Sequence, residues 1–124
     1  MAQLASKIVD QEPAAPAAAI DRAQLSRMSL GDRSLEREVL QLFDRQADLL
    51  LARMQIAEPA VVATLAHTLK GSAASIGATG VERAAAAVEH AAGAAAHNSA
   101  IGRLALAIDH AGAEIAALLG ASEG

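Results

Sequence analysis

The sequence of 124 residues has no cysteine, no tryptophan and no tyrosine, and Phe43 is its single aromatic residue. The lack of cysteine excludes disulfides, iron–sulfur clusters, thiolate zinc sites and a cysteine nucleophile. The lack of aromatic residues disfavours β-rich folds and removes the platforms on which nucleic-acid bases stack. With 10 Lys and Arg against 14 Asp and Glu, and a net charge of −4, the chain is not expected to bind a nucleic acid.

Long hydrophobic runs are also missing. No stretch approaches the roughly 18 uncharged apolar residues that a membrane span requires, and the segment from Met1 to Pro16 does not resemble a signal peptide. The chain has the length of one domain, and with 53% hydrophobic and 19% charged residues it is too apolar to be disordered. We expect a folded, monomeric, cytoplasmic protein that makes no contact with a membrane.

Residues 1–19 lack apolar periodicity and include Pro13 and Pro16, so we expect a flexible N-terminal leader there and one domain over residues 20–120. A capping box formed by Asp21 and Gln24 predicts a short helix that ends near Gly31.

Four longer segments follow, in which apolar residues recur at intervals of three and four. They predict helices over residues 34–54, 59–76, 79 to about 98, and about 98 to 120. In the first of them the expected buried stripe consists of Leu35, Val39, Leu42, Phe43, Ala47, Leu50 and Met54. Short connections favour antiparallel neighbours, so the predicted fold class is all-α: an antiparallel up-and-down four-helix bundle with a short extra N-terminal helix.

Local signals mark the ends of these helices. Pro59 suits a first helical turn, and Gly77 suits a helix end. Thr79 with Glu82 predicts a second capping box. For the last helix we expect an N-cap at Asn98 or Ser99 and an end at Gly120.

A helical wheel predicts that all four histidines point away from the core. His90, His97 and His110 fit ordinary solvated surface residues. His67 differs because its face of the helix is smooth, with Lys70 as the only charge. The small residues expected on this face are Ala60, Ala63, Thr64, Gly71 and Ala74.

Gly71 costs roughly 1 kcal/mol relative to alanine inside a helix, although no core packing requires it there. A glycine one turn after an exposed His67, with Lys70 beside it, leaves space for a bulky group on the ring and supplies a cation. This description fits a phosphoryl group. A metal site is not expected, because Lys70 and Gly71 occupy the positions where further ligands would stand. No serine-hydrolase elbow and no nucleotide-binding loop occurs.

Antiparallel packing about a turn near Thr79 places Glu89 or His90 at the height of His67. A Glu89 carboxylate that accepts a hydrogen bond from Nδ1–H would leave Nε2 facing outward as a nucleophile. The alternative, an unpaired surface glutamate, stays open at this point.

Residues 66–78 read AHTLKGSAASIGA and contain the pattern H-x-L-K-G-S-x-x-x-x-G. This pattern resembles the signature of histidine-containing phosphotransfer (Hpt) domains, and the resemblance extends over about residues 20–118. It implies that His67 is phosphorylated on Nε2, that Lys70 assists at the phosphoryl group, that Gly71 keeps access open and that Glu89 orients the ring. Gly77 matches the glycine that ends the active helix.

The resemblance further implies a phosphoryl carrier without kinase or ATP-binding activity of its own. Its partners would be response-regulator receiver domains and a hybrid histidine kinase, with Mg²⁺ on the receiver and no cofactor on this chain. Partner contacts are expected around Ala60, Ala63, Thr64 and Ala74. A histidine-kinase dimerisation domain fits less well, since Thr68 stands where an acidic residue usually follows the histidine. A second reading is a non-catalytic helical adaptor that docks a partner through the small residues around His67.

Overall fold

The computed structural model describes the backbone of residues 18–123 and the side chains of residues 18–120. Its helices are α2 (Arg22–Ser29), α3 (Arg33–Met54), α4 (Pro59–Ile76), α5 (Thr79–Ala91) and α6 (His97–Glu123). No strand occurs within residues 18–123, which confirms the predicted all-α class. Apart from Ala18 and Ala19, the expected leader lies outside the described residues.

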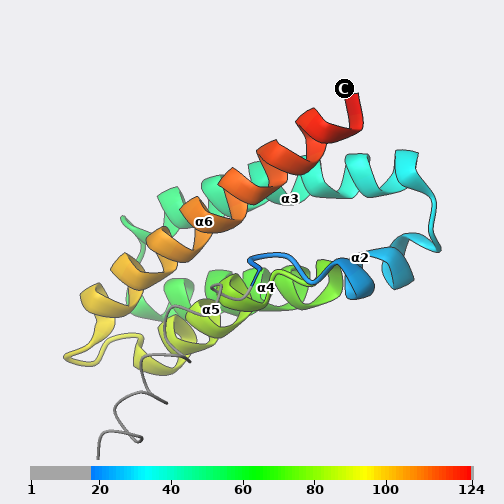
Figure 1. Cartoon of the computed structure of the whole chain (residues 1–124). Helices are drawn as coiled ribbons and strands as arrows, with labels where there is room; N and C mark the ends of the chain where they lie inside the picture. Colours follow the sequence, from blue (N-terminus) through cyan, green and yellow to red (C-terminus); the bar gives the residue numbers. More distant parts are fainter. Residues whose placement is uncertain (1–17, 124) are drawn as a thin grey trace, which may run out of the picture.

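The four longer helices form an antiparallel bundle, and each packs on two neighbours (Figure 1). Helices α3 and α6 form one layer, and α4 and α5 form the other. The short α2 packs on α3 and α4 at one end of the bundle. No helix in the described part of the chain is both long enough and apolar enough to cross a bilayer.

The buried face of α3 differs from the predicted stripe. Leu42 is 58% exposed and Leu35 also lies at the surface, whereas Leu40 is buried. Because α3 packs on both α4 and α6, its buried face is centred near Phe43 and Ala47, and Leu42 falls on the shoulder of the helix. The other buried residues of the long helices include Leu50, Met54, Val62, Leu65, Leu69, Ala73, Ile76, Val81, Ala85, Val88, Ile101, Leu104, Ile108, Ala111 and Ile115.

Asp21 caps α2, since its carboxylate accepts hydrogen bonds from the backbone N–H groups of Ala23 and Gln24. The predicted reciprocal half of the capping box is absent. The Gln24 amide donates to the backbone oxygen of Ser75 instead, and the Asp21 N–H donates to the Gly77 oxygen over 2.7 Å. Both bonds tie the start of α2 to the end of α4.

Gly77 makes the turn between α4 and α5 with a φ of 81°, a conformation that favours glycine. A Cβ at this position would lie 2.6 Å from the backbone oxygen of Asp21, so the close approach of α2 also requires glycine. The predicted capping box at Thr79 is wrong. Thr79 is already the first residue of α5, and its N-cap, Ala78, provides no side-chain hydrogen bond.

The connection between α5 and α6 begins earlier than predicted. Helix α5 ends at Ala91, and Gly93 follows with a φ of 80°. Helix α6 begins at His97, so the predicted N-caps at Asn98 and Ser99 are wrong. At the other end, α6 continues through Gly120 to Glu123. Gly93 has a positive φ, which allows the chain to turn after α5. Gly120 keeps the helical conformation, so α6 continues through it.

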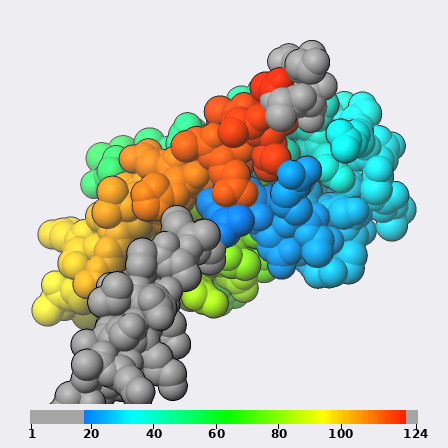
Figure 2. All heavy atoms as spheres, in the orientation of Figure 1, coloured from blue at the N-terminus to red at the C-terminus, as the bar shows by residue number. Residues whose placement is uncertain are grey.

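The segment before α2 is anchored to α6 by one carboxylate. The Glu114 side chain accepts hydrogen bonds from the backbone N–H groups of Ala19 and Ile20, over 2.9 and 3.0 Å. Ile20 is fully buried, and Figure 2 shows this segment, in dark blue, lying against α6, in orange. The packed part of the protein therefore includes Ala19, which the sequence assigned to the leader.

Candidate functional site

His67 lies on the outer face of α4, opposite the side chains that this helix buries. Val62, Leu65 and Leu69 point into the core and are at most 9% exposed. The side chain of His67, in contrast, is 67% exposed. The imidazole is therefore held at the surface by a helix whose other face is fixed in the core.

The carboxylate of Glu89 connects His67 with Lys70. Glu89 follows the buried Val88 on α5, which places it at the edge of that helix next to α4. Its Oε2 lies 3.0 Å from Nδ1 of His67, and its Oε1 lies 2.9 Å from Nζ of Lys70. Both oxygens of one carboxylate thus bind consecutive turns of α4.

These contacts keep Glu89 ionised. The hydrogen bond from the Lys70 ammonium lowers the pKa of the Glu89 carboxyl the most, and the hydrogen bond with His67 lowers it further against an opposing effect of burial. An ionised carboxylate only accepts hydrogen bonds, so the proton in the contact belongs to Nδ1 of His67. In the neutral ring, Nε2 then carries the lone pair and faces away from Glu89.

The surface around the ring has low relief. A Cβ added to Gly71 would meet no atom within 4 Å, so this glycine borders open space. Ala60 and Thr64 are exposed, and Ala63 and Ala74 are half-buried. The Thr64 hydroxyl donates to the backbone oxygen of Ala60. A partner could approach His67 along this face without meeting a large side chain.

Chemically, the arrangement combines a nucleophilic ring nitrogen, a carboxylate behind the ring and an ammonium group at its side. Such a set suits the transfer of an anionic group to nitrogen, since the carboxylate offsets positive charge on the ring and the ammonium offsets negative charge on the group. Over the described residues, no group of three or more His, Cys, Asp or Glu side chains is arranged to hold a metal ion.

The family model of the Hpt domain matches residues 37–121 of this sequence, which is more than half of its 124 residues. The chain belongs to the Hpt domain family. No curated protein and no solved structure matches it. Hpt domains act in histidine phosphotransfer within two-component phosphorelays, where they work with receiver domains and kinases. This chain is therefore a phosphorelay protein, and its match to the family covers α4 and α5, which carry the site.

A groove in this Hpt domain, beside the face that carries His67, was missed at the level of sequence. Ser72 and Ser75, which follow His67 on α4, form one wall, and Leu42 on α3 forms part of the other. Its volume is about 390 Å³, and it is lined by Met28, Val39, Leu42, Phe43, Gln46, Ser72, Ser75 and Ile76. Leu35, Leu42 and Leu49 are spaced by seven and lie on one exposed line of α3, but only Leu42 lines the groove, so this spacing does not indicate the groove itself.

The remaining histidines of the Hpt domain lie outside the site. His90 and His110 are exposed, as predicted. His97 is half-buried, and its Nδ1 accepts a hydrogen bond from the backbone N–H of Gly93 over 3.0 Å. His97 is thus a surface residue whose ring also bonds the connection between α5 and α6, a contact that the prediction of an ordinary solvated histidine did not include.

Proposed function

We propose that this Hpt domain carries its phosphoryl group on Nε2 of His67, receiving it from one receiver-domain aspartate and passing it to another. The observation that supports this most is the contact between Glu89 and Nδ1, because it leaves Nε2 as the exposed nucleophile. Hpt membership supports the general role, and the contact supports the choice of residue and atom.

In the transfer step, the Nε2 lone pair of neutral His67 attacks the phosphorus of an aspartyl phosphate. A nitrogen–phosphorus bond forms, the bond between phosphorus and the aspartate oxygen breaks, and the aspartate leaves as a carboxylate. The ring keeps its Nδ1 proton and becomes positively charged. The Glu89 carboxylate, 3.0 Å from Nδ1, stabilises this charge and fixes the plane of the ring.

Lys70 would neutralise charge on the phosphoryl group. In the structure its ammonium binds Oε1 of Glu89, so it is held on the turn that follows His67. Lys70 would share this task with a Mg²⁺ ion on the receiver domain, because phosphoryl transfer depends mainly on positioning and charge neutralisation. No cofactor would be bound by this chain alone.

The receiver domain would dock over the small residues around His67, where Gly71 leaves open space. Ala60, Ala63, Thr64 and Ala74 would form the centre of the contact. The groove at Leu42 extends this face toward α3 and offers apolar area, since Leu42 is 58% exposed. We expect the domain to act as a monomer in the cytoplasm, with a hybrid histidine kinase as the source of phosphate.

The test is incubation with a radiolabelled phosphorylated receiver domain and Mg²⁺. The wild type and the control His90→Gln should acquire the label, whereas His67→Gln should not. His90 is a matched control because it is exposed and lies next to Glu89 in the sequence. Equal labelling of His67→Gln and wild type would overturn the proposal. If neither protein is labelled but both bind the receiver, the protein is the non-catalytic adaptor instead.

A further inference from the structure

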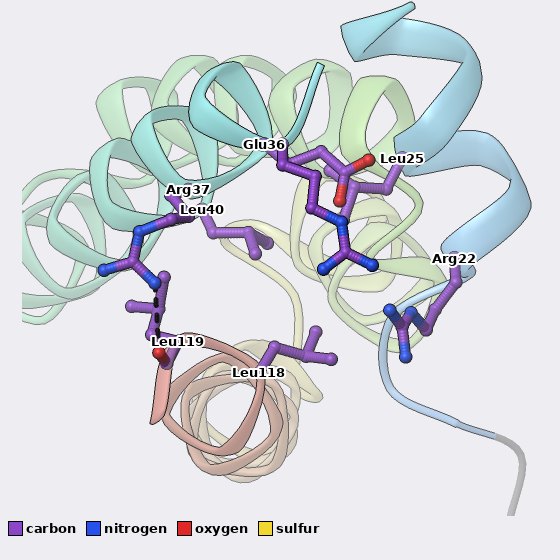
Figure 3. Close-up of a pocket in the computed structure, with 8 residues that line it drawn as sticks. Arg22, Leu25, Glu36, Arg37, Leu40, Leu118 and Leu119 are labelled. Atoms are coloured by element: carbon purple, nitrogen blue, oxygen red, sulfur yellow. Dashed lines mark hydrogen bonds between the residues drawn. The ribbon is translucent and has the colours of Figure 1, made fainter. Parts of the chain in front are cut away.

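A second cleft lies at the end of the bundle where α2, the start of α3 and the end of α6 meet (Figure 3). Its volume is about 250 Å³. No residue of α4 or α5 lines it, so it is separate from the site at His67. The lining residues are Arg22, Leu25, Arg33, Glu36, Arg37, Leu40, Leu118 and Leu119.

The cleft concentrates positive charge in an acidic protein. The chain has a net charge of −4 and only 10 Lys and Arg, yet three arginines and a single glutamate line this cleft. Arg22 and Arg33 are exposed and make no hydrogen bond or ion pair with any residue that the structure describes. Such guanidinium groups are available for an external anion.

Two further contacts give the cleft a defined shape. One nitrogen of Arg37 donates to the backbone oxygen of Leu119 over 3.0 Å, which connects α3 to α6 (Figure 3). The Glu36 carboxylate accepts a hydrogen bond from the hydroxyl of the buried Ser29 over 3.2 Å, which connects α3 to α2. These two hydrogen bonds connect α3 to both α6 and α2, the three helices that form the walls of the cleft.

The floor of the cleft is apolar. Leu25 and Leu40 are 2% and 3% exposed, and Leu118 is half-buried. Figure 3 shows Leu40 and Leu118 between the guanidinium groups of Arg22 on one side and Arg37 on the other. A ligand in this space therefore meets guanidinium groups at the rim and leucine side chains at the floor, where Leu118 is more accessible than Leu25 and Leu40.

We propose that this cleft binds a small organic monoanion, a carboxylate on an apolar chain. The arginines would hold the carboxylate, with Arg22 and Arg33 free to pair with it, and the leucines would cover the chain. A single negative charge is the expected match, because Arg37 has partners of its own and Glu36 offsets one of the two charges of Arg22 and Arg33.

Octanoate is the probe for this proposal, with binding followed by NMR shifts of backbone amides during titration of the full chain. Saturable shifts should centre on Leu25, Leu40 and Leu118. Octanol lacks the charge and acetate lacks the apolar chain, so both should bind at least about tenfold more weakly than octanoate. Octanol binding as tightly as octanoate, or phosphate binding more tightly, would overturn the assignment.

Variants test the same point without using phosphotransfer. The double variant Arg22→Gln/Arg33→Gln should weaken octanoate binding by about tenfold or more, since it removes the charge and keeps the floor. Arg45→Gln, an exposed arginine elsewhere on α3, should leave binding unchanged. His67→Gln should also leave it unchanged, so this result is independent of the role of His67. Unaltered binding by the double variant, or no saturable shift in the wild type, refutes the proposal.

Discussion

The Glu89 carboxylate lies 3.0 Å from Nδ1 of His67, on a neighbouring helix, and its other oxygen is bound by Lys70. The pair therefore has two consequences that experiments can separate. It adds an electrostatic contact between α4 and α5, and it fixes which ring nitrogen is exposed. Each consequence has its own pH dependence or kinetic readout.

Replacing Glu89 with Gln should lower the free energy of unfolding at neutral pH, and this difference from wild type should disappear in acid. The pKa of Glu89 is lowered in the folded state from its ordinary 4.5, mainly by Lys70. A lowered pKa stabilises the folded state above the unfolded value of 4.5, and this stabilisation is lost as the pH falls through the lowered value. Urea unfolding of both proteins, at pH 7 and in steps below pH 4.5, measures the effect.

Glu82→Gln is the matched control, because Glu82 also lies on α5 and its side chain makes no hydrogen bond or ion pair with any residue that the structure describes. Its stability relative to wild type should not depend on pH in the same interval. A Glu89→Gln difference that persists unchanged in acid would show that the contact stabilises the protein through packing and not through charge.

Lys70→Ala should slow phosphotransfer without unfolding the protein. A hydrogen bond to a charged group contributes about 1.5–3 kcal/mol, so the loss of Lys70 should reduce the transfer rate by about 10- to 100-fold. Lys70 is only partly buried, and its one ion pair in the described structure is with Glu89. Lys70→Ala should therefore lower stability only by the modest contribution of this surface contact, as Glu89→Gln does, and the protein should stay folded. Rates of label transfer from a phosphorylated receiver, with circular dichroism as the folding check, measure both effects. Lys70→Arg keeps the positive charge and should transfer faster than Lys70→Ala. If it does not, the charge at this position is not sufficient, and the reaction requires the size and geometry of the lysine amine.

Two substitutions of Gly71 should affect stability and receiver docking differently. A Cβ there meets no atom within 4 Å, so Gly71→Ala should raise the free energy of unfolding by about 0.5–1 kcal/mol through helix propensity alone. Gly71→Gln should also fold, yet it should block transfer because its side chain fills the space beside His67. Thermal unfolding and transfer rates measure the two properties. Undiminished transfer by Gly71→Gln would refute the prediction that phosphotransfer requires open space beside His67.

The fold could be predicted from the sequence where the spacing of apolar residues and the residues that begin and end helices indicate the same bounds. Helix α4 has Pro59 at its start, Gly77 after its end and a regular apolar stripe between them, and the structure gives the same bounds. The short turn at Gly77 also fixes the antiparallel register that brings Glu89 to the height of His67. Both inferences depend on backbone geometry, which the sequence specifies strongly here.

The parts that could not be predicted depend on tertiary packing. Leu40 and Leu42 are equally apolar, and only the position of α4 and α6 decides which of them is buried. The end of α5 and the start of α6 lie in an alanine-rich segment, where apolar and polar residues do not alternate with a helical period. The sequence therefore did not indicate Gly93 as the turn. The contact of Lys70 with Glu89 depends on the rotamers of two long side chains, and no spacing rule gives these.

Gly77→Ala should destabilise the protein by about 2 kcal/mol or more. The residue has a φ of 81°, which costs other residues about 1–2 kcal/mol, and a Cβ would clash with the backbone oxygen of Asp21 at 2.6 Å. Urea unfolding measures the loss. Gly102→Ala is the control, because a Cβ there meets open space on α6, and it should be neutral or stabilising. Equal stability of the two variants would mean that α2 does not depend on this approach.

Glu114→Ala should release the segment before α2. The carboxylate accepts hydrogen bonds from the N–H groups of Ala19 and Ile20, and Ile20 is fully buried, so its loss leaves a backbone donor without a partner. Such a loss costs about 1–3 kcal/mol. Hydrogen exchange at the Ile20 amide should become faster, and urea unfolding should show the lower stability. Glu38→Ala, at an exposed position of α3, should change neither property. Ala19 and Ile20 lie outside the segment that matches the family, whereas Glu114 lies within it. Unchanged exchange at Ile20 would show that Glu114 does not hold this segment on the Hpt bundle.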